Sequence, residues 1–372
     1  METVLPFADQ SVGSRHRRIV DQFETLAVDA LLVTSLANVR WLTGFSGSNG
    51  FVVLSGDRFV LVTDNRYQTS AAAEVDAANS MAEVMVPEAF DDELYVGLLG
   101  LYDSVGFEAE GLSWKKHETL GNAIANVELV PTTRVCEKQR RFKDEGEQNL
   151  LAKAANIADE ALRRVAPIIG PGSTERQIAA ELDVHMKRLG AEDAAYETIV
   201  ASGPNSALPH ARPTDRRLQT GDLLIVDVGA RVHGYGSDMT RTFVVGAGPT
   251  DEQQRWYNAV LAAQQAGVAA LGVDVEEHAI DEICRSVLAD FGFEEAFIHG
   301  TGHGIGLEIH EDPVLSPRSS GTLHSGLVIT VEPGIYFPGV GGVRIEDAVS
   351  ISDPACTTLT KTPKSLNPTS IK

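Results

Sequence analysis

The sequence predicts a mixed α/β protein with two domains, a small α/β domain at residues 1–134 and a larger α+β domain at residues 135–372. A chain of 372 residues is longer than most single domains. Its first third alternates short apolar strand patterns with helical patterns, which is typical of an α/β domain. Pro131 and a charged stretch at residues 138–147 then precede a long helical pattern, so we expect the boundary between them.

The elements of the first domain follow from its hydrophobic periodicity. Residues 15–26 have the spacing of one amphipathic helix, and residues 30–33 form an apolar strand pattern. Residues 51–54 and 59–62 predict a hairpin, because the turn-forming residues 55–57 separate them. Three more strands, separated by helical stretches, are predicted near residues 81–86, 104–107 and 127–130.

The second domain opens with a predicted helix at residues 145–165 that ends before Pro167. Thr174 and Thr250 each precede a glutamine by three residues, a capping-box pattern that starts a helix. These two helices are expected to end near residues 189 and 271, and another spans about residues 275–291. Strands are predicted at residues 223–228, 240–245, 327–331, 342–345 and 348–351.

Composition excludes several classes of protein. The chain is 43% hydrophobic and 22% charged, as in an ordinary soluble globular protein, and no apolar stretch is long enough to cross a bilayer. A formal net charge of −21 argues against binding to nucleic acid or to an acidic membrane. Residues 1–10 lack the apolar core of an export signal, and three scattered cysteines fit a reducing compartment. We therefore expect a cytoplasmic protein.

Five candidate metal ligands lie at predicted strand ends or in glycine-rich turns. Each one alone has an ordinary interpretation as a turn cap, a surface carboxylate or a loop histidine. Together in one pocket, four carboxylates and one imidazole would repel each other or take up protons unless cations balanced them. Two divalent ions, bridged by two of the carboxylates, would do so. The five residues are Asp227, Asp238, His303, Glu332 and Glu346.

The ligand types favour hard or borderline ions. Mn²⁺ is our first expectation, with Co²⁺, Zn²⁺ and Fe²⁺ as alternatives. A hydroxide held between two such ions hydrolyses amides, esters or phosphoesters, and the ligands alone do not choose among these. Competing motifs fail: residues 300–305 lack the third glycine of a dinucleotide loop, residues 310–314 are not a zinc-peptidase motif, and residues 44–48 are not a nucleophile elbow.

With their flanking residues, these five positions resemble the pita-bread metallopeptidases, and among them the Xaa-Pro dipeptidases and Xaa-Pro aminopeptidases. Residues 38–45 and 63–67 resemble the creatinase-like N-terminal domain of these enzymes, although Trp41 stands where the family pattern has a tyrosine. The resemblance implies a creatinase-like domain followed by a pita-bread catalytic domain, in a homodimer. In the catalytic domain it is carried by residues 207–210, 227–229, 237–242, 300–306, 308–311, 331–336 and 341–347.

The resemblance also implies a role for each ligand. Asp227 would chelate one ion, Asp238 and Glu346 would bridge both ions, and His303 and Glu332 would complete the other. A neighbouring hydroxyl would hold a bridging carboxylate in place. Further positions that match the family's site are Thr240, which carries that hydroxyl, and His210, His299, His310, Tyr336 and Arg344.

The expected reaction is attack on an Xaa-Pro peptide bond by a hydroxide that bridges the two ions. Glu332 would pass the proton of the hydroxide to the leaving nitrogen, and His310 would stabilise the oxyanion. His210 would form a wall of the proline pocket, which is needed because an Xaa-Pro bond has no N–H to grip. Arg344 would either bind a substrate carboxylate or orient ligands such as Asp227.

The expected substrates are small peptides with proline at the second position, and the sequence leaves dipeptidase and aminopeptidase both open. A creatinase-like amidinohydrolase works without metal, a methionine aminopeptidase usually lacks the N-terminal domain, and a non-catalytic pita-bread binding protein typically loses ligands. Arg66 has two interpretations: it reaches the partner's site across a dimer, or it is a surface arginine at a strand-to-helix turn. The sequence favours the second.

Overall fold

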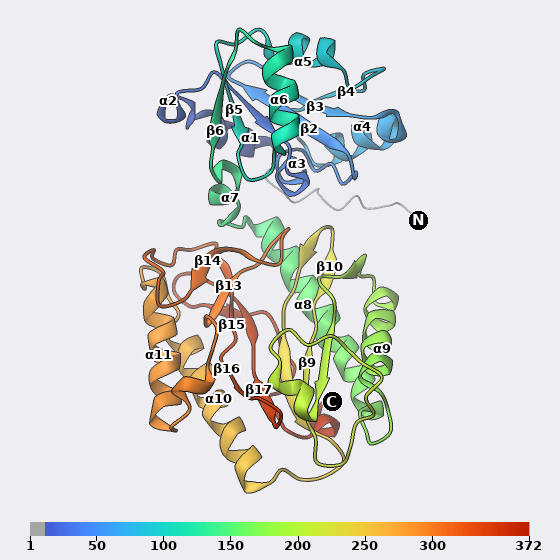
Figure 1. Cartoon of the computed structure of the whole chain (residues 1–372), viewed down its shortest axis with the longest axis vertical. Helices are drawn as coiled ribbons and strands as arrows, with labels where there is room; N and C mark the ends of the chain where they lie inside the picture. Colours follow the sequence, from blue (N-terminus) through green and yellow to red (C-terminus); the bar gives the residue numbers. More distant parts are fainter. Residues whose placement is uncertain (1–11, 372) are drawn as a thin grey trace. The chain divides into compact units, whose positions relative to one another are not determined.

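The computed structural model describes residues 12–371 (Figure 1). Residues 1–10, on which the expectation about an export signal rests, lie outside this range. The described residues form two compact units, one up to Arg140 together with Asp144–Gly146, and one of Arg141–Lys143 together with the residues from Glu147 onward. Helix α7 (Val135–Arg140) contacts α1 (Val12–Val20) and α3 (Leu36–Thr43) and so belongs to the first unit. The boundary expected from sequence, 134/135, lies just before this helix.

The first unit is built on a six-stranded mixed sheet in the order β4-β3-β2-β1-β5-β6. The three central strands pair antiparallel, and β4, β5 and β6 pair parallel to their neighbours. The predicted hairpin and the three outer strands are confirmed. The strands are β1 (Ala30–Val33), β2 (Gly50–Ser55), β3 (Phe59–Thr63), β4 (Glu83–Met85), β5 (Ser104–Glu108) and β6 (Glu128–Thr132).

Apolar strand residues such as Leu32, Val53 and Val105 form the core of this unit together with Tyr95 of α5 and Leu120 of α6. The alternation of strands and helices predicted for this part of the chain is therefore confirmed. Its remaining helices are α1 (Val12–Val20), α2 (Phe23–Leu26), α3 (Leu36–Thr43), α4 (Gln68–Ala77), α5 (Asp92–Leu99) and α6 (Trp114–Ala123).

The prediction of one helix over residues 15–26 is wrong in one respect. The helix ends at Val20, and a turn at residues 21–22 separates it from the short α2. In this turn the backbone N–H of Gln22 bonds to the carbonyl of Ile19, three residues back, and its side-chain amide donates to the carbonyl of Arg18. These two bonds close the end of α1, a local competition that hydrophobic spacing does not reveal.

The second unit has helices on both outer sides of its strands (Figure 1). Helices α8 and α9 pack their apolar faces on the three-stranded sheet β12-β9-β8. Helices α10 and α11 pack on the five-stranded sheet β14-β13-β15-β18-β19. The predicted helices are confirmed: α8 (Glu145–Val165), α9 (Glu175–Arg188), α10 (Asp251–Ala270) and α11 (Glu277–Asp290).

Two of these helices begin at the predicted capping boxes. Thr174 accepts from the backbone of Gln177, whose side chain bonds back to the backbone of Thr174. Thr250 and Gln253 make the same reciprocal pair at the start of α10. Each pair satisfies two backbone donors that a helix start would otherwise leave without partners.

The strands of the second unit include all those predicted from sequence. Its two smaller sheets are β11-β10-β7 and β16-β17. The strands are β7 (Asp193–Ala194), β8 (Ile199–Ser202), β9 (Leu223–Asp227), β10 (Ala230–Val232), β11 (Tyr235–Gly236), β12 (Thr240–Val244), β13 (Gly302–Gly304), β14 (Glu311–Leu315), β15 (Val328–Val331), β16 (Gly334–Phe337), β17 (Gly341–Arg344), β18 (Asp347–Ser350) and β19 (Thr357–Thr358). The 3₁₀ turns are η1 (Asn65–Tyr67), η2 (Ala166–Ile168), η3 (Gly203–Ala207), η4 (Glu294–Ala296) and η5 (Pro368–Ser370).

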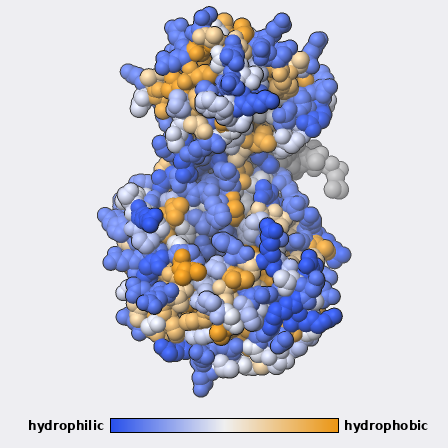
Figure 2. Space-filling model, in the orientation of Figure 1, coloured by the Kyte–Doolittle hydropathy of each residue, from blue (hydrophilic) through white to orange (hydrophobic). Residues whose placement is uncertain are grey.

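Hydrophilic residues cover most of the face shown in Figure 2, and hydrophobic residues lie between them in small groups. Within residues 12–371, no helix combines the length and the apolar character needed to span a bilayer. Cys136, Cys284 and Cys356 are free thiols.

Candidate metal centre

The two aspartates are brought together by the β9–β12 hairpin. Asp227 ends β9 and pairs with Thr240, the first residue of β12, while Asp238 lies two residues before that strand. The backbone N–H of Val228 bonds to the carbonyl of Met239 and continues the pairing. Gly229 allows the two chains to approach, because a Cβ there would lie 2.0 Å from the carbonyl oxygen of Ser237.

His303 occupies the middle of β13 between two glycines that the packing requires. A Cβ at Gly302 would lie 2.0 Å from the carbonyl oxygen of Thr330, and one at Gly304 would lie 2.3 Å from that of Asp312. The glycines therefore let β13 run close to its neighbours with the imidazole directed at the carboxylates. Glu332 follows β15 directly, and its backbone N–H bonds to the carbonyl of Thr301 at 2.7 Å.

Glu346 lies in the gap between β17 and β18 and is almost completely buried. Its backbone N–H bonds to the carbonyl of Thr240 at 3.1 Å, and the Thr240 hydroxyl donates to its Oε2 at 2.7 Å. Thr240 thus makes the carboxylate contact that the sequence led us to expect. Its role in positioning a metal ligand stays a prediction.

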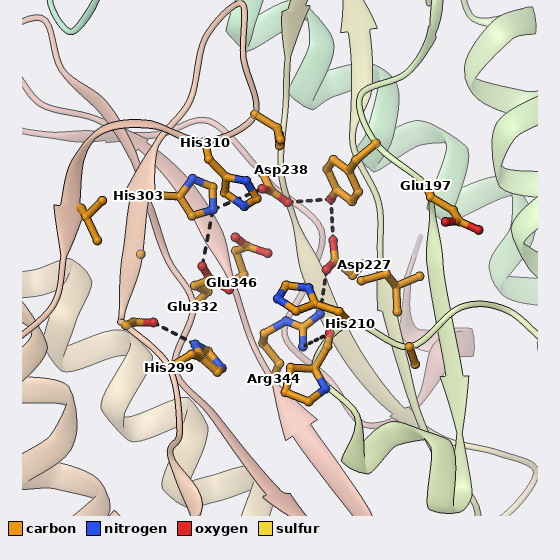
Figure 3. A pocket seen from close by; sticks show the side chains of 18 of the residues that line it. Glu197, His210, Asp227, Asp238, His299, His303, His310, Glu332, Arg344 and Glu346 are labelled. Carbon is orange, nitrogen blue, oxygen red and sulfur yellow. Dashed lines mark hydrogen bonds and ion pairs between the residues drawn. The ribbon is translucent and has the colours of Figure 1, made fainter. Parts of the chain in front are cut away.

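The donor groups converge in one cluster (Figure 3). Asp238, His303 and Glu346 each offer a ligand atom within 4.8 Å of the other two. His303 Nε2 lies 3.7 Å from Asp238 Oδ2 and 3.5 Å from Glu332 Oε1. Asp227 lies beside Asp238, and the Tyr196 hydroxyl contacts both carboxylates. The structure therefore brings all five predicted ligands to one cavity.

Burial and mutual repulsion dominate the electrostatics of this cluster. Desolvation, reinforced by the charge of Asp227, raises the pKa of Asp238 well above its ordinary value. Desolvation also raises the pKa of Glu346 and of Glu332, with the charge of a neighbouring carboxylate as the next cause in each case. Burial lowers the pKa of His303 to about 4, so this imidazole is neutral at pH 7.

These features fit divalent cations. A neutral imidazole and several carboxylates that repel each other make a donor set that cations would stabilise in its ionised form. Oxygen donors with one nitrogen suit Mn²⁺, Co²⁺, Fe²⁺ or Zn²⁺. The donor atoms of Asp238, His303 and Glu346 are close enough to share an ion, and all five residues lie in strands or within two residues of a strand end.

Tyr196 is a site residue that the sequence reasoning missed. Its hydroxyl lies 2.5 Å from Asp227 Oδ1 and 2.6 Å from Asp238 Oδ1, so it bridges the two aspartates. Burial and the nearby charges of Asp227 and Asp238 raise the pKa of this phenol well above its ordinary value, so the proton stays on the hydroxyl. No local pattern marks Tyr196, because both partners are distant in sequence.

The contacts of Arg344 favour one of its two interpretations. Its Nη2 donates to Asp227 Oδ2 at 2.6 Å, its Nη1 donates to the Tyr336 hydroxyl and to the carbonyl of Pro209, and its Nε donates to the Thr240 hydroxyl. The guanidinium is buried, and each of its three nitrogens already donates a hydrogen bond. These contacts favour the orienting interpretation over binding of a substrate carboxylate.

The cavity has a volume of about 550 Å³, and three further histidines line it beside the ligand cluster. His210 and His310 are exposed, and the His310 ring lies 4.4 Å from that of His303. His299 Nε2 lies 2.9 Å from the Tyr336 hydroxyl, and burial lowers the pKa of His299 to about 4. The structure thus places the predicted substrate residues around the ligand cluster.

Residues 149–353 match the family described as metallopeptidase family M24, and residues 15–142 match the creatinase/prolidase N-terminal domain. The chain belongs to the M24 metallopeptidases. This M24 protein is therefore a peptidase, and its predicted fold class, a creatinase-type domain followed by a pita-bread catalytic domain, is confirmed.

Relatives of this M24 protein match it over nearly their whole length. An Xaa-Pro dipeptidase of Pyrococcus horikoshii is 36% identical, with 95% of this chain and 99% of the relative covered. The solved structure of an Xaa-Pro dipeptidase from Bacillus anthracis has a TM-score of 0.91 at 37% identity, covering 96% and 99% of the two chains. That of an X-Pro aminopeptidase from Thermotoga maritima has a TM-score of 0.85 at 33% identity, covering 93% and 100%. These relatives do not favour the amidinohydrolase or the non-catalytic binding protein.

Proposed function

We propose that this protein hydrolyses the peptide bond before proline in small Xaa-Pro peptides with the help of two divalent cations, Mn²⁺ being our first choice. One observation carries the proposal: four carboxylates and a neutral imidazole converge in a cavity that three further histidines line. The names of the M24 relatives support the same substrate class.

The proposed ligand assignment follows the family resemblance. Asp227 would hold one ion, Asp238 and Glu346 would be shared by both ions, and His303 and Glu332 would hold the other. Bound there, the cations would polarise a substrate carbonyl and make a water molecule acidic enough to act as nucleophile near neutral pH.

The remaining chemistry belongs to side chains of the protein. Glu332 accepts the proton of the attacking hydroxide and delivers it to the proline nitrogen. This nitrogen is a leaving group that must be protonated as it departs. His310, exposed on the cavity wall beside His303, donates to the oxyanion, and His210 forms a wall for the proline ring.

Arg344 and Tyr196 act on the aspartates in this proposal. Arg344 fixes Asp227 through Oδ2, while Tyr196 holds Oδ1 of the same carboxylate and Oδ1 of Asp238. The free oxygen of Asp238 then faces His303. Both residues set the direction of the donor atoms without contacting substrate.

The decisive experiment compares Ala-Pro, Ala-Pro-Ala and a longer Xaa-Pro peptide with each of several divalent ions added to metal-free protein. We expect cleavage before proline that depends on the ion. Cleavage of Ala-Pro alone identifies a dipeptidase, and cleavage of all three identifies an aminopeptidase. Absence of proline release with every ion, together with absence of bound metal, would contradict the proposal.

A cytoplasmic location and a homodimer stay predictions from sequence. The oligomeric state is measurable by sedimentation equilibrium. Arg66, the residue considered for a role across a dimer, lies in the first unit with an exposed side chain and an ion pair of 2.8 Å to Asp64.

A further inference from the structure

Two charged side chains on the cavity wall have no part in the proposed metal chemistry. They are Glu197 and Arg212, which form an ion pair with Arg212 Nε 3.1 Å from Glu197 Oε2. Both are solvent-exposed, with 82% of the Arg212 side chain and 61% of the Glu197 side chain accessible. In Figure 3, Glu197 lies apart from the carboxylate cluster, beyond Asp227.

The two arginines that line this cavity differ in what they can still bind. Arg344 is buried, and its guanidinium is bound to an aspartate, a tyrosine, a threonine and a backbone carbonyl. Arg212 is held by one exposed ion pair, a kind of contact that contributes little and exchanges readily. An incoming carboxylate can therefore replace Glu197 on Arg212 at small cost, because the guanidinium fork matches a carboxylate as well as it matches Glu197.

The position of Arg212 suits the carboxyl end of a dipeptide. It follows His210, the proposed wall for the proline ring, by two residues, and the cavity lining includes His210, Ala211 and Arg212 in succession. In an Xaa-Pro dipeptide the free carboxylate is attached to the proline ring itself, next to the leaving nitrogen. A cation on the segment that holds the ring is therefore close to that carboxylate.

We propose that Arg212 recognises the free carboxylate of an Xaa-Pro dipeptide, with Glu197 as the partner that it releases on binding. This inference rests on the proposed function and deepens it. It makes the site prefer dipeptides, because a longer peptide carries a neutral amide at this position, which cannot form a charged pair with the guanidinium.

The test compares Ala-Pro with Ala-Pro-amide, which lacks the carboxylate charge, in the Mn²⁺-loaded protein. We expect wild type to prefer Ala-Pro. Arg212→Gln should lower kcat/KM for Ala-Pro roughly 2- to 5-fold, as for loss of an exposed ion pair, with little change for the amide. The loss should appear in KM, since the contact is the same in ground state and transition state.

Two further variants serve as controls. Glu197→Gln removes the competing carboxylate, so KM for Ala-Pro should fall while KM for the amide stays unchanged. Arg212→Lys keeps the charge but loses the fork, so it should recover part of the preference for Ala-Pro that Arg212→Gln loses.

Equal loss on both substrates in Arg212→Gln, or a wild type that does not distinguish them, would overturn the inference. If the wild type cleaves neither, the proposed function has failed, and calorimetric binding of both ligands to the metal-free protein decides the inference separately. Tighter binding of Ala-Pro than of Ala-Pro-amide that is lost in Arg212→Gln supports the inference. Equal affinities of the wild type for the two ligands refute the inference.

Discussion

Tyr196 joins Asp227 and Asp238 through a single hydroxyl group, and we expect its loss to weaken metal binding. In Tyr196→Phe the two carboxylates lose a shared donor and can turn away from the ions. Changes of this kind typically cost 10- to 100-fold in metal affinity. Titration calorimetry with Mn²⁺ measures the effect. Tyr102→Phe, which removes a hydroxyl bonded to Ser55 in the first unit, should leave the affinity unchanged.

Replacing Asp238 should remove activity without unfolding the protein. Asp238→Ala should abolish turnover, because a proposed bridging ligand is lost. The metal-free variant should remain folded, since one of several mutually repelling buried carboxylates is removed. Activity with added Mn²⁺ and urea unfolding of the metal-free form test both parts. The exposed Asp290→Ala is the control, and an active, metal-independent Asp238→Ala protein would refute the site.

The packing of β13 against β15 should not tolerate a side chain at Gly302. In Gly302→Ala the new Cβ would meet the carbonyl of Thr330 at 2.0 Å, so the strands must separate and His303 must move relative to Glu332. We expect destabilisation of about 1–3 kcal/mol, as for overpacking, with weaker Mn²⁺ binding. Denaturant unfolding and calorimetry check this. Gly170→Ala, where the new Cβ would meet no atom within 4 Å, should change neither quantity.

The start of α10 depends on the capping hydroxyl of Thr250. Thr250→Ala removes the capping hydroxyl from the backbone of Gln253 and should lower the free energy of unfolding by about 1 kcal/mol. Thr250→Ser keeps a capping oxygen and should lose much less. Unfolding in urea measures both, and an equal loss in the two variants would speak against the capping bond as the cause.

Helices and strands were predictable from sequence where local chemistry determines them. The capping boxes at Thr174 and Thr250 depend on residues three apart, and the strand that ends in Asp227 is an uninterrupted apolar run. The break at Gln22 was missed, because a side-chain bond to the carbonyl of Arg18 competes with the helix there. Tyr196 was missed because its partners become neighbours only when β9 and β12 pair.

For the whole molecule, the pKa shifts predict how stability without metal depends on pH. A carboxyl with a raised folded-state pKa stabilises the fold below its unfolded pKa, and this contribution is lost as pH rises through the folded pKa. Asp238, Glu332 and Glu346 are of this kind. The pKa values of His299 and His303 are lowered to about 4. These two histidines therefore make stability rise with pH, but only between about pH 4 and 6.5.

The metal-free protein should therefore lose stability as pH rises from about 6.5 to about 8, below the range where tyrosines titrate. Bound Mn²⁺ should remove this loss and add about 2.7 kcal/mol at a free concentration 100 times Kd. Urea unfolding with chelator or with Mn²⁺ at several pH values tests this. Asp238→Asn should flatten the metal-free profile, and a metal-free wild type that gains stability over this range would contradict the electrostatic account.

The pairing of β9 with β12 has a consequence for how this protein can vary. The two aspartates are aligned by the ladder from Asp227 opposite Thr240 to Leu223 opposite Val244, and not by the number of residues in the excursion between them. That excursion turns at His233 and Gly234, both with positive φ. Extra residues inserted at this tip would lengthen an outlying ribbon while the ladder kept the two carboxylates facing one another. A sequence search for distant homologues that requires a fixed number of residues between the two aspartates would therefore miss active members of the family.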